Sequence, residues 1–335
     1  MNQAYQALVL NKTGEGDVQA RVQTRQWNEL PSGDVTIQVA YSSLNYKDAL
    51  ACSPNGNIVK SYPFVPGVDL AGTVVDSTDA RFVAGQRVLV TGYELGVSYD
   101  GGLSEYARVP ADWVIPLPEE LSCRDAMIFG TAGLTAALSI ERLERHGVKP
   151  EDGPVLVTGA SGGVGTFAVA MLAAGGYEVA AVSGKPQLAD ALRQLGAKEV
   201  MARTELLPER PRPLDKQRWA AAVDVCGGPI LTAVLASLHY GGAVAASGLT
   251  AGSSLPATVY PFILRGITLY GIDSVYVDQA RRSALWSRIA TDWAHLVQLQ
   301  RVNEIHLTEV AAVAARMLEG QTWGRTIVNI AGTKP

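Results

Sequence analysis

The chain has 335 residues, 47% of them hydrophobic and 18% charged, which is the balance of a folded protein of about two domains and excludes a disordered chain. Its formal net charge is −4 and its 28 Lys and Arg residues are spread along the sequence, so no basic surface for nucleic acid is expected. No apolar run reaches the roughly 20 residues that span a bilayer and the first residues lack the pattern of a secretory signal, so we expect a cytoplasmic protein with neither nucleic acid nor membrane as a partner.

The first third of the chain is predicted to be mostly β-structure. Short runs of β-branched residues, over 34–39, 72–75 and 87–90, alternate with turns rich in Gly, Pro and Asp. The segment 124–147 has a different pattern, because its apolar residues recur at helical spacing until Gly147 ends the run. Helix is therefore expected to dominate from this segment onward.

Strands and helices are predicted to alternate through the middle of the chain. The apolar run 155–157 is followed by a glycine-rich turn and by an apolar stretch, 164–174, that indicates a buried helix. The pattern repeats with strands at 178–182, 221–225 and 243–246 and with helices at 187–195 and 230–238. Such alternation favours right-handed crossovers and an α/β fold with a doubly wound parallel sheet that is covered on both faces.

The remaining segments are predicted to be mixed. Apolar residues at helical spacing predict an amphipathic helix over 281–299, and a β-branched run predicts a closing strand over 326–330. Prolines interleaved with charges over 207–213 predict a surface loop.

The three cysteines, Cys52, Cys123 and Cys226, lie far apart in the sequence. Their odd number and their spacing fit neither a disulfide framework nor a Cys-x-x-Cys metal site. We therefore expect free thiols in a reducing compartment, packed as small apolar side chains.

The glycine-rich turn at 157–165 (VTGASGGVG) lies between a predicted strand and a predicted helix. Its spacing, Ala160-x-Gly162-x-x-Gly165, matches the dinucleotide-binding fingerprint with Ala at the turn position. Gly162 lets the backbone approach a pyrophosphate, Gly165 lets the helix pack closely on the strand, and the amides at the helix start attract phosphate charge. The alternative is an ordinary glycine-rich turn. Cofactor contacts are predicted from Ser161, Gly162, Gly163, Val164 and Gly165.

The end of the next predicted strand indicates which dinucleotide binds. An NAD site normally carries Asp or Glu about 20 residues after the fingerprint, to accept hydrogen bonds from the ribose hydroxyls. Here the chain has Ser183 and Lys185 instead, which would bind a 2′-phosphate that an acid would repel. Arg203, after the following strand-like run, adds a second cation. These three residues predict NADPH as the cofactor, with solvated surface charges as the alternative for Lys185 and Arg203.

Two further segments resemble the zinc site of alcohol dehydrogenases in the medium-chain dehydrogenase/reductase superfamily. Residues 43–48 (SLNYKD) are similar to the region of the first zinc ligand, and residues 66–72 (PGVDLAG) to the Gly-His-Glu segment. Asn45 stands where that family has a zinc cysteine and Val68 where it has a histidine, and the four-cysteine structural lobe is missing. Because neither side chain is a donor for zinc, we expect a zinc-independent enzyme without a bound metal.

The resemblance is closer to the quinone-oxidoreductase-like branch of this superfamily, and within it to the NADPH-dependent acryloyl-CoA reductases. It extends over essentially the whole chain and rests on the segments 45–50 (NYKDAL), 130–133 (GTAG), 157–165, 261–266 (PFILRG), 271–275 (GIDSV) and 324–326 (GRT). It implies a GroES-like, mostly β catalytic domain over 1–125 and 275–335 and a Rossmann domain over 126–274. It also implies a homodimer that reduces acryloyl-CoA to propanoyl-CoA.

The resemblance assigns roles to residues that spacing alone would not select. Leu249, Ser274 and Asn329 correspond to cofactor contacts in the family. Arg265 lies in a motif that is next to the cofactor in the family, and it is a candidate for a contact to a CoA phosphate or a ribose oxygen of the substrate. The alternative for Arg265 is a salt bridge within the fold.

Reduction of an activated C=C bond without a metal needs a hydride from the nicotinamide to the β-carbon and hydrogen-bond donors that polarise the thioester oxygen. Tyr46 offers a phenol at a position that contacts the nicotinamide in the family, and Asn45 offers an amide. Both are candidate catalytic residues, with core packing as the alternative for Tyr46 and an ordinary turn as the alternative for Asn45. Lys47, Asp48 and Asp69 are expected only to support this site.

Two other functions stay open at this point. A reductase of quinones, or of free enals and enones, needs the same hydride donor and differs only in its acceptor pocket. A protein that binds NADPH without catalysis also fits such a scaffold, although Tyr46, Asn45 and the complete glycine turn favour an enzyme. NADPH oxidation measured in parallel with acryloyl-CoA, crotonyl-CoA and a quinone separates these functions.

Overall fold

The computed structural model describes residues 4–14, 16–207, 210 and 212–332. The chain forms two compact units, which we call the β-rich unit and the parallel-sheet unit. The β-rich unit comprises Met1–Thr131, Val275–Val297 and Arg301–Pro335, and the parallel-sheet unit comprises Ala132–Ser274 and Gln298–Gln300. The limits expected for the two family domains, at 125/126 and 274/275, stay a prediction.

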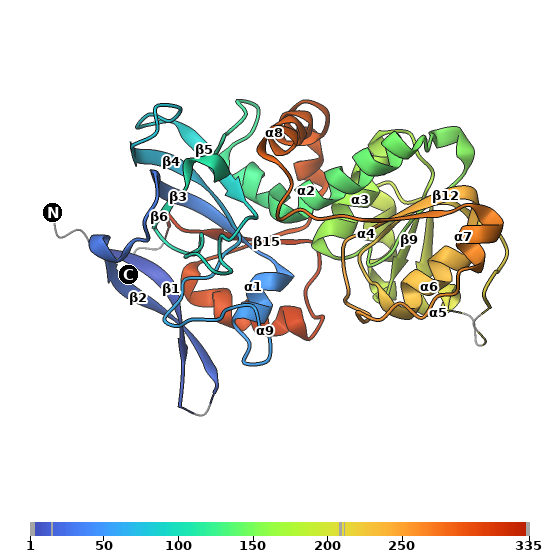
Figure 1. Ribbon diagram of the computed structural model, residues 1–335, viewed down its shortest axis with the longest axis horizontal. Helices are drawn as coiled ribbons and strands as arrows, with labels where there is room; N and C mark the ends of the chain where they lie inside the picture. Colours follow the sequence, from blue (N-terminus) through green and yellow to red (C-terminus); the bar gives the residue numbers. More distant parts are fainter. Residues whose placement is uncertain (1–3, 15, 208–209, 211, 333–335) are drawn as a thin grey trace. The chain divides into compact units, whose positions relative to one another are not determined.

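The strands described in the β-rich unit form a seven-stranded sheet and a separate hairpin. The sheet has the order β14-β15-β3-β4-β5-β7, with β6 paired to β3, and each pair is antiparallel except β14 with β15. Its strands are β3 (Val35–Leu44), β4 (Asp69–Ser77), β5 (Arg87–Thr91), β6 (Tyr106–Val109), β7 (Ile115–Pro116), β14 (Val302–Ile305) and β15 (Arg325–Asn329). Figure 1 shows β15 (red) among strands coloured blue to cyan, so both ends of the chain build this sheet.

The hairpin consists of β1 (Ala4–Lys12) and β2 (Val18–Gln26), which pair antiparallel along their whole length. Most of β1 is buried, whereas β2 is mainly exposed, so only β1 contributes to the core. This hairpin was not predicted, because β2 is rich in polar side chains and lacks a long β-branched run.

Helices complete the core of the β-rich unit. α1 (Tyr46–Ala51) follows β3 directly, and α9 (Val310–Leu318) packs against it. Val310 and Val313 lie on one face of α9 and join a buried cluster with side chains of the sheet, among them Leu44, Leu70 and Val328. Short 3-10 turns connect the strands at Trp27–Glu29, Ala111–Trp113 and Leu307–Glu309.

The predicted helix over 124–147 is confirmed as α2 (Cys123–His146), but it is broken. Gly130 has φ 50° and ψ −156° inside the helix, a conformation that only glycine adopts without strain. The break lies just before the boundary between the units, because Thr131 belongs to the β-rich unit and Ala132 to the parallel-sheet unit.

The predicted amphipathic helix over 281–299 is only partly an α-helix. α8 (Gln279–Arg288) continues as a π-helical turn, Ile289–Trp293, and a 3-10 segment, Ala294–Leu299. The Thr291 hydroxyl donates to the carbonyl of Arg288 at 3.3 Å, and such a local side-chain bond competes with the α-helical ladder. The changed pitch keeps Ile289 and Trp293 buried.

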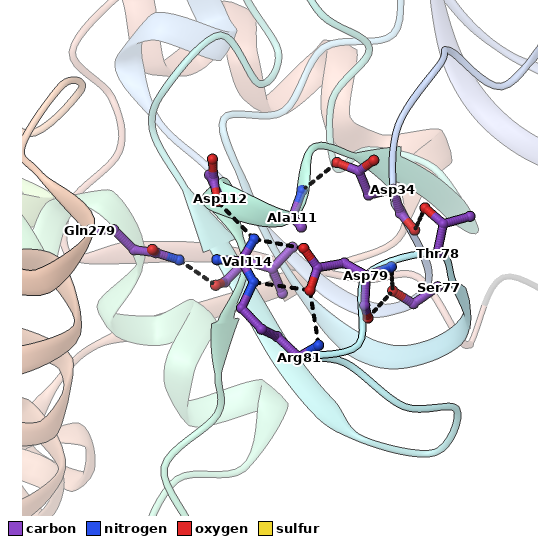
Figure 2. A network of polar contacts seen from close by, with 9 residues as sticks. All are labelled: Asp34, Ser77, Thr78, Asp79, Arg81, Ala111, Asp112, Val114 and Gln279. Carbon is purple, nitrogen blue, oxygen red and sulfur yellow. Dashed lines mark hydrogen bonds and ion pairs between the residues drawn. The ribbon is translucent and has the colours of Figure 1, made fainter.

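A polar network orders the loops before β3 and after β4 (Figure 2). Arg81, after β4, contacts Asp79 at 2.8 Å and Asp112 of the 3-10 turn at 2.7 Å. Asp34 accepts from the backbone N–H of Ala111 at 3.0 Å. The hydrogen bonds from Arg81 lower the pKa of Asp79 to about 2. These groups are exposed and solvent screens them, so they order the loops more than they stabilise the fold.

The sheet of the parallel-sheet unit has six strands in the order β10-β9-β8-β11-β12-β13, all parallel. The strands are β8 (Val155–Val157), β9 (Val179–Ser183), β10 (Glu199–Ala202), β11 (Trp219–Asp224), β12 (Leu238–Ala246) and β13 (Thr268–Gly271). The chain leaves β8 toward one edge and later returns to β11 on the other side of β8. The gap between the carboxyl ends of β8 and β11 is therefore the switch point at which such sheets bind ligands.

Helices cover both faces of this sheet. The helical elements are α3 (Gly163–Ala174), α4 (Ala189–Gln194), α5 (Arg203–Leu206), α6 (Gly228–Ser237), α7 (Tyr260–Arg265) and the 3-10 turns Pro150–Asp152 and Pro186–Leu188. Leu156 and Ala222, on one face, pack with Val234 of α6, and Val155 and Val157, on the other face, are also fully buried. The predicted α/β fold class is thus confirmed.

One strand and one loop of this unit differ in how well they were predicted. β13 was not predicted as a strand. Within the predicted loop over 207–213, Arg210, Arg212 and Pro213 are exposed, and residues 208, 209 and 211 lie outside the described residues.

Among the described helices of the whole chain, none combines the length and apolarity needed to cross a membrane.

Candidate active site

The glycine-rich turn lies at the switch point, directly after β8. Gly159 has φ 58°, and a Cβ built on it would lie 2.5 Å from Cγ2 of Val225. A Cβ on Gly165 would lie 2.3 Å from the carbonyl oxygen of Gly159, so α3 packs on the turn as closely as predicted. The turn conformation itself is at Gly159 and not at Ala160, whose N–H donates to Val182 in the neighbouring strand at 3.0 Å.

The N-terminus of α3 is open for an anion. Gly162 is the N-cap residue, no side chain caps the helix, and Gly162 is exposed while Gly163 and Val164 are half-buried. The first N–H groups of a helix have no partner within it, and they carry the positive end of the helix dipole. α3 has 12 residues, so this end suits a pyrophosphate. The structure thus places four of the predicted cofactor residues, Gly162 to Gly165, at the uncapped start of α3, and their binding role stays a prediction.

The side chains predicted to select the cofactor also gather at the end of β9. The Ser183 hydroxyl donates to Ser161 Oγ at 3.0 Å and accepts from the backbone N–H of Lys185 at 3.1 Å. A Cβ on Gly184 would lie 3.1 Å from Nη2 of Arg203, so the guanidinium rests on this glycine. Burial lowers the pKa of Lys185. Two cations and two hydroxyls at one strand end suit a phosphate monoester.

Asp224, at the carboxyl end of β11, joins the two loops at the switch point and was missed from the sequence. Its buried carboxylate accepts from Thr158 Oγ1 at 2.6 Å and from the N–H of Gly227 at 2.8 Å. Burial raises its pKa, and the two donors oppose that shift. The sequence signal was an acid at the end of an otherwise apolar strand.

A second polar cluster forms in the β-rich unit around Asp69, the first residue of β4. Its buried carboxylate accepts from Ser43 Oγ at 2.5 Å, from Asn45 Nδ2 at 2.8 Å, and from both N–H and Oγ1 of Thr131 at 2.9 and 2.5 Å. Four donors satisfy an ionised carboxylate inside a protein. Asp69 therefore contacts Asn45 as expected of a supporting residue, and its functional role stays a prediction.

Arg325, at the start of β15, is the second charged group of this cluster and was not singled out from the sequence. Its Nε donates to the carbonyl of Ile128 at 2.7 Å, and its Nη1 donates to Asn45 Oδ1 at 3.2 Å. Burial lowers its pKa, and the charges of Asp69 and Asp48 oppose that shift. Its place in the segment 324–326 was the only signal.

The side-chain amide of Asn45 and its backbone N–H all have hydrogen-bond partners. Its Nδ2 contacts Asp69 and also Ser43 Oγ, at 3.1 Å, and its Oδ1 contacts Arg325. Its backbone N–H donates to Asp48 Oδ2 at 2.8 Å, and the other oxygen of Asp48 accepts from the N–H of Val68 at 3.0 Å. Burial raises the pKa of Asp48 to about 7, with these backbone donors opposing the shift.

Tyr46, the first residue of α1, differs from its neighbours in being accessible. Its side chain is 43% exposed, and its hydroxyl makes no hydrogen bond to any residue that the structure describes. Lys47 likewise forms no hydrogen bond or ion pair with the described residues, so it does not join the cluster of Asp48 and Asp69.

Among the other predicted site residues, Leu249 lies at the switch point, since a Cβ on Gly227 would lie 3.2 Å from its Cα. Asn329 pairs with Tyr41 at the far end of β15 from Arg325, and its Nδ2 donates to Glu304 at 3.1 Å. Arg265 donates to the backbone carbonyls of Ala236, Leu238 and Asp215, which uses much of its donor capacity within the fold. Leu249 is exposed and Ser274 half-buried. The roles assigned to these four residues stay predictions.

Zinc does not fit the positions at which the resembled dehydrogenases bind it. Asn45 uses its amide within the cluster, and Val68 is buried and carries no donor atom. The described residues also contain no group of three or more His, Cys, Asp or Glu side chains that could hold a metal. Neither position thus offers a zinc ion a side-chain ligand.

Comparison with known families matches both units. Residues 31–119 match the alcohol dehydrogenase GroES-like domain, and residues 163–291 match the family named zinc-binding dehydrogenase. Together these two matches cover more than half of the chain.

Individual proteins match over nearly the whole length. The chain is 48% identical to the "Acrylyl-CoA reductase AcuI" of Ruegeria pomeroyi, over 97% of this chain and 99% of that one. It is 50% identical to the "Putative quinone oxidoreductase YhfP" of Bacillus subtilis over 98% and 100% of the two chains, and the solved structure of that protein, with NAD bound, superposes with a TM-score of 0.95. The yhdH oxidoreductase of Salmonella enterica, in complex with NADP, is 49% identical over 97% and 99%, with a TM-score of 0.94.

The cations beside Ser183 generate a prediction about cofactor choice. A charge-assisted hydrogen bond contributes about 1.5 to 3 kcal/mol, so Lys185→Ala should raise the KM for NADPH about tenfold. Arg203→Ala should have a smaller effect, because that guanidinium is exposed and screened. Steady-state kinetics with NADPH and NADH measure both effects, and the NADH values should stay near those of the unmodified protein.

Lys198→Ala is the matched control. Lys198 precedes β10, at the amino edge of the sheet, and pairs with Glu178 at 3.7 Å, so its loss should leave both cofactors unaffected. Equal losses with NADPH and NADH in Lys185→Ala would instead assign Lys185 to the fold.

The donor set around Asn45 generates a second prediction. Incubation with a strong chelator should leave the turnover of the purified protein unchanged, because Asn45 and Val68 offer zinc no ligands. Elemental analysis should find far less than one zinc per chain. A stoichiometric zinc whose removal abolishes turnover would refute the prediction.

Proposed function

Because the chain belongs to the medium-chain dehydrogenase/reductase superfamily and is an oxidoreductase, we propose that it is a zinc-independent reductase of α,β-unsaturated acyl-CoA thioesters, converting acryloyl-CoA to propanoyl-CoA. The nearly full-length similarity to an acrylyl-CoA reductase supports this acceptor. The three free cysteines suit a reducing compartment, and we propose a cytoplasmic location.

NADPH is the cofactor, and when bound it supplies the hydride for the β-carbon of the substrate. The chain's own contribution to binding comes from the parallel-sheet unit. The open start of α3 binds the pyrophosphate, and Lys185 and Arg203 bind the 2′-phosphate beside Ser183. These contacts hold the cofactor at the carboxyl edge of the sheet.

The observation that carries the proposal is the accessible side chain of Tyr46 next to a fixed Asn45. Hydride addition to the β-carbon moves negative charge onto the thioester oxygen, and a donor directed at that oxygen stabilises the transition state more than the ground state. The Tyr46 hydroxyl has no competing partner among the described residues. We therefore assign the donor role to Tyr46.

Asn45 takes a different role in this proposal. Its amide hydrogens are directed at Asp69 and Ser43 and its oxygen at Arg325, so the amide faces the buried cluster. Asn45 orients the residue that follows it and does not donate to the substrate. We propose this positioning role for Asn45, which leaves donation to the substrate to Tyr46.

Quinones, free enals and enones are the alternative acceptors. Arg265, which was the candidate for a CoA phosphate, uses its guanidinium on backbone carbonyls, so it adds no support for a CoA thioester. NADPH oxidation with acryloyl-CoA, crotonyl-CoA and a quinone in parallel decides the acceptor. Tight NADPH binding without oxidation by any of them would indicate a protein that binds the cofactor and does not catalyse.

The donor role of Tyr46 predicts the effect of removing its hydroxyl. Loss of one transition-state donor commonly costs about 2.7 to 4 kcal/mol, so Tyr46→Phe should lower kcat with acryloyl-CoA roughly a hundredfold. The melting temperature should stay close to that of the unmodified protein, because the ring remains and the hydroxyl has no partner to lose. Near-normal turnover in Tyr46→Phe would refute the donor role.

Isotopic labelling tests the reaction itself. Deuterium from C4-labelled NADPH should appear at the β-carbon of propanoyl-CoA. Its appearance at the α-carbon would refute conjugate reduction.

We further propose that the partner of this chain is a second copy of itself. β13 is an edge strand of the six-stranded sheet, and an edge strand exposes unpaired backbone donors and acceptors. Directly before it, α7 and its N-cap expose large apolar side chains, namely Val259, Tyr260, Ile263 and Leu264. An uncovered strand edge beside an apolar patch suits isologous pairing with another copy.

A charge in this patch should separate the dimer. Light scattering should give about twice the chain mass of 35.5 kDa for the unmodified protein and the monomer mass for Ile263→Glu, because a buried unpaired carboxylate is costly. Val83→Glu is the control, since Val83 is equally exposed but lies in the β-rich unit. A dimer that survives Ile263→Glu would place the interface elsewhere.

A further inference from the structure

The break in α2 leaves backbone groups that the helix cannot satisfy. A helix end leaves its last carbonyl groups and its first N–H groups without helical partners. At Gly130 both kinds of end occur inside the protein, because the first segment of α2 stops there and the second starts at Thr131. Unpaired backbone groups in a buried position are costly, so the break needs partners from outside the helix.

Asp69 and Arg325 supply these partners from opposite sides. Arg325 donates through Nε to the carbonyl of Ile128 at 2.7 Å and through Nη2 to that of Met127 at 3.4 Å. Asp69 accepts from the N–H of Thr131 at 2.9 Å. The cation therefore caps the carbonyl end and the anion caps the amide end, which is the arrangement that the helix dipole favours.

Gly130 is the residue that makes this arrangement fit. A Cβ on Gly130 would lie 2.6 Å from Oδ2 of Asp69, 2.9 Å from Oγ of Ser43 and 3.0 Å from Nη2 of Arg325. The two charged side chains thus occupy the space in which a side chain would stand. The positive φ of Gly130 and this lack of space are independent reasons for glycine.

The same two residues hold the amide of Asn45. Asp69 Oδ2 lies 2.8 Å from Asn45 Nδ2, and Arg325 Nη1 lies 3.2 Å from Asn45 Oδ1. Asn45 is the N-cap residue of α1, and Tyr46 is the first residue of that helix. Since the Tyr46 hydroxyl makes no hydrogen bond to a described residue, the direction of its side chain depends on the backbone that Asn45 fixes.

We propose that Asp69 and Arg325 are positioning residues for the reaction: together they cap the two ends of the break in α2 and hold Asn45, and thereby direct the Tyr46 phenol at the substrate. This inference rests on the role proposed above for Tyr46. Neither charged group touches the substrate. Their contribution is to fix a donor before the transition state forms, which is the source of much of an enzyme's rate enhancement.

The test compares a buried carboxylate of the β-rich unit, that of Asp69, with a half-buried one. Asp69→Asn keeps the shape of the side chain but replaces one acceptor oxygen by a donor, and it should lower kcat about tenfold to a hundredfold through misplacement of Tyr46. The Kd for NADPH, measured by fluorescence, should change less than about twofold, because the residues proposed to bind the cofactor phosphates lie in the other unit. Turnover is measured with whichever acceptor of the panel the unmodified protein reduces fastest, so an error in the acceptor does not affect the result.

Asp100→Asn is the matched control. Asp100 is half-buried in the same unit and accepts from the N–H of Val65 at 3.0 Å, but has no contact with Asn45. It should lower the melting temperature without a change in kcat. Equal losses of kcat in Asp69→Asn and Asp100→Asn would refute the proposal.

The effect of a double variant on kcat distinguishes the positioning role of Asp69 from a purely structural one. If Asp69 acts through Tyr46, adding Asp69→Asn to Tyr46→Phe should lower kcat no further than Tyr46→Phe alone. Losses that multiply would overturn the inference, and normal turnover in Tyr46→Phe itself would overturn the proposed donor role instead. Asn45→Ala, which leaves both charges in place, should show the same non-additivity if Asp69→Asn does not fold.

Discussion

The buried carboxylate of Asp69 and the buried guanidinium of Arg325 join four segments of the β-rich unit around Asn45. Moving such charges out of water costs several kcal/mol for each ion unless hydrogen bonds and the opposite charge offset it. Here the offset comes from four donors to Asp69, and from Asn45 and the carbonyls of α2 for Arg325. The end of β3, the start of β4, the break in α2 and the start of β15 therefore have to meet at one place, and the position of Tyr46 follows from that meeting.

The dinucleotide half of the chemistry has a different physical basis. In the parallel-sheet unit, the proposed recognition depends on backbone N–H groups at the start of α3 and on the absence of side chains at Gly159 and Gly165, where a Cβ would collide with neighbouring atoms. In the same proposal, the charges of Lys185 and Arg203 beside Ser183 discriminate between the cofactors. The glycine turn acts through sterics, and the residues at the end of β9 act through charge. A substitution at the end of β9 should therefore change the cofactor preference without altering the turn.

The segments that resemble a zinc site contribute to a hydrogen-bonded cluster of charged side chains in this chain. Where alcohol dehydrogenases of the superfamily have a zinc cysteine, this chain has Asn45, and its amide bridges an anion and a cation that a metal-binding thiolate could not bridge. In the proposed function, polarisation of the substrate depends on the Tyr46 hydroxyl as donor, which is weaker than a Lewis acid but suits an acceptor that is already activated by conjugation with a thioester.

The sequence by itself determined the superfamily, the α/β fold class and the strand, turn and helix of the dinucleotide site, which are confirmed. These depend on local sterics and on periodicity within short windows. The β1–β2 hairpin, β13 and the π-helical turn after α8 were missed, because short or polar segments give a weak periodic signal in the sequence. Only the tertiary structure joined Asn45 to Asp69, 24 residues away, and to Arg325, 280 residues away. Likewise, only it revealed Asp224 as the link between the loops at the switch point. A buried charge acquires its role from the groups that desolvate and pair it, and those groups are brought together by the fold and not by spacing along the chain.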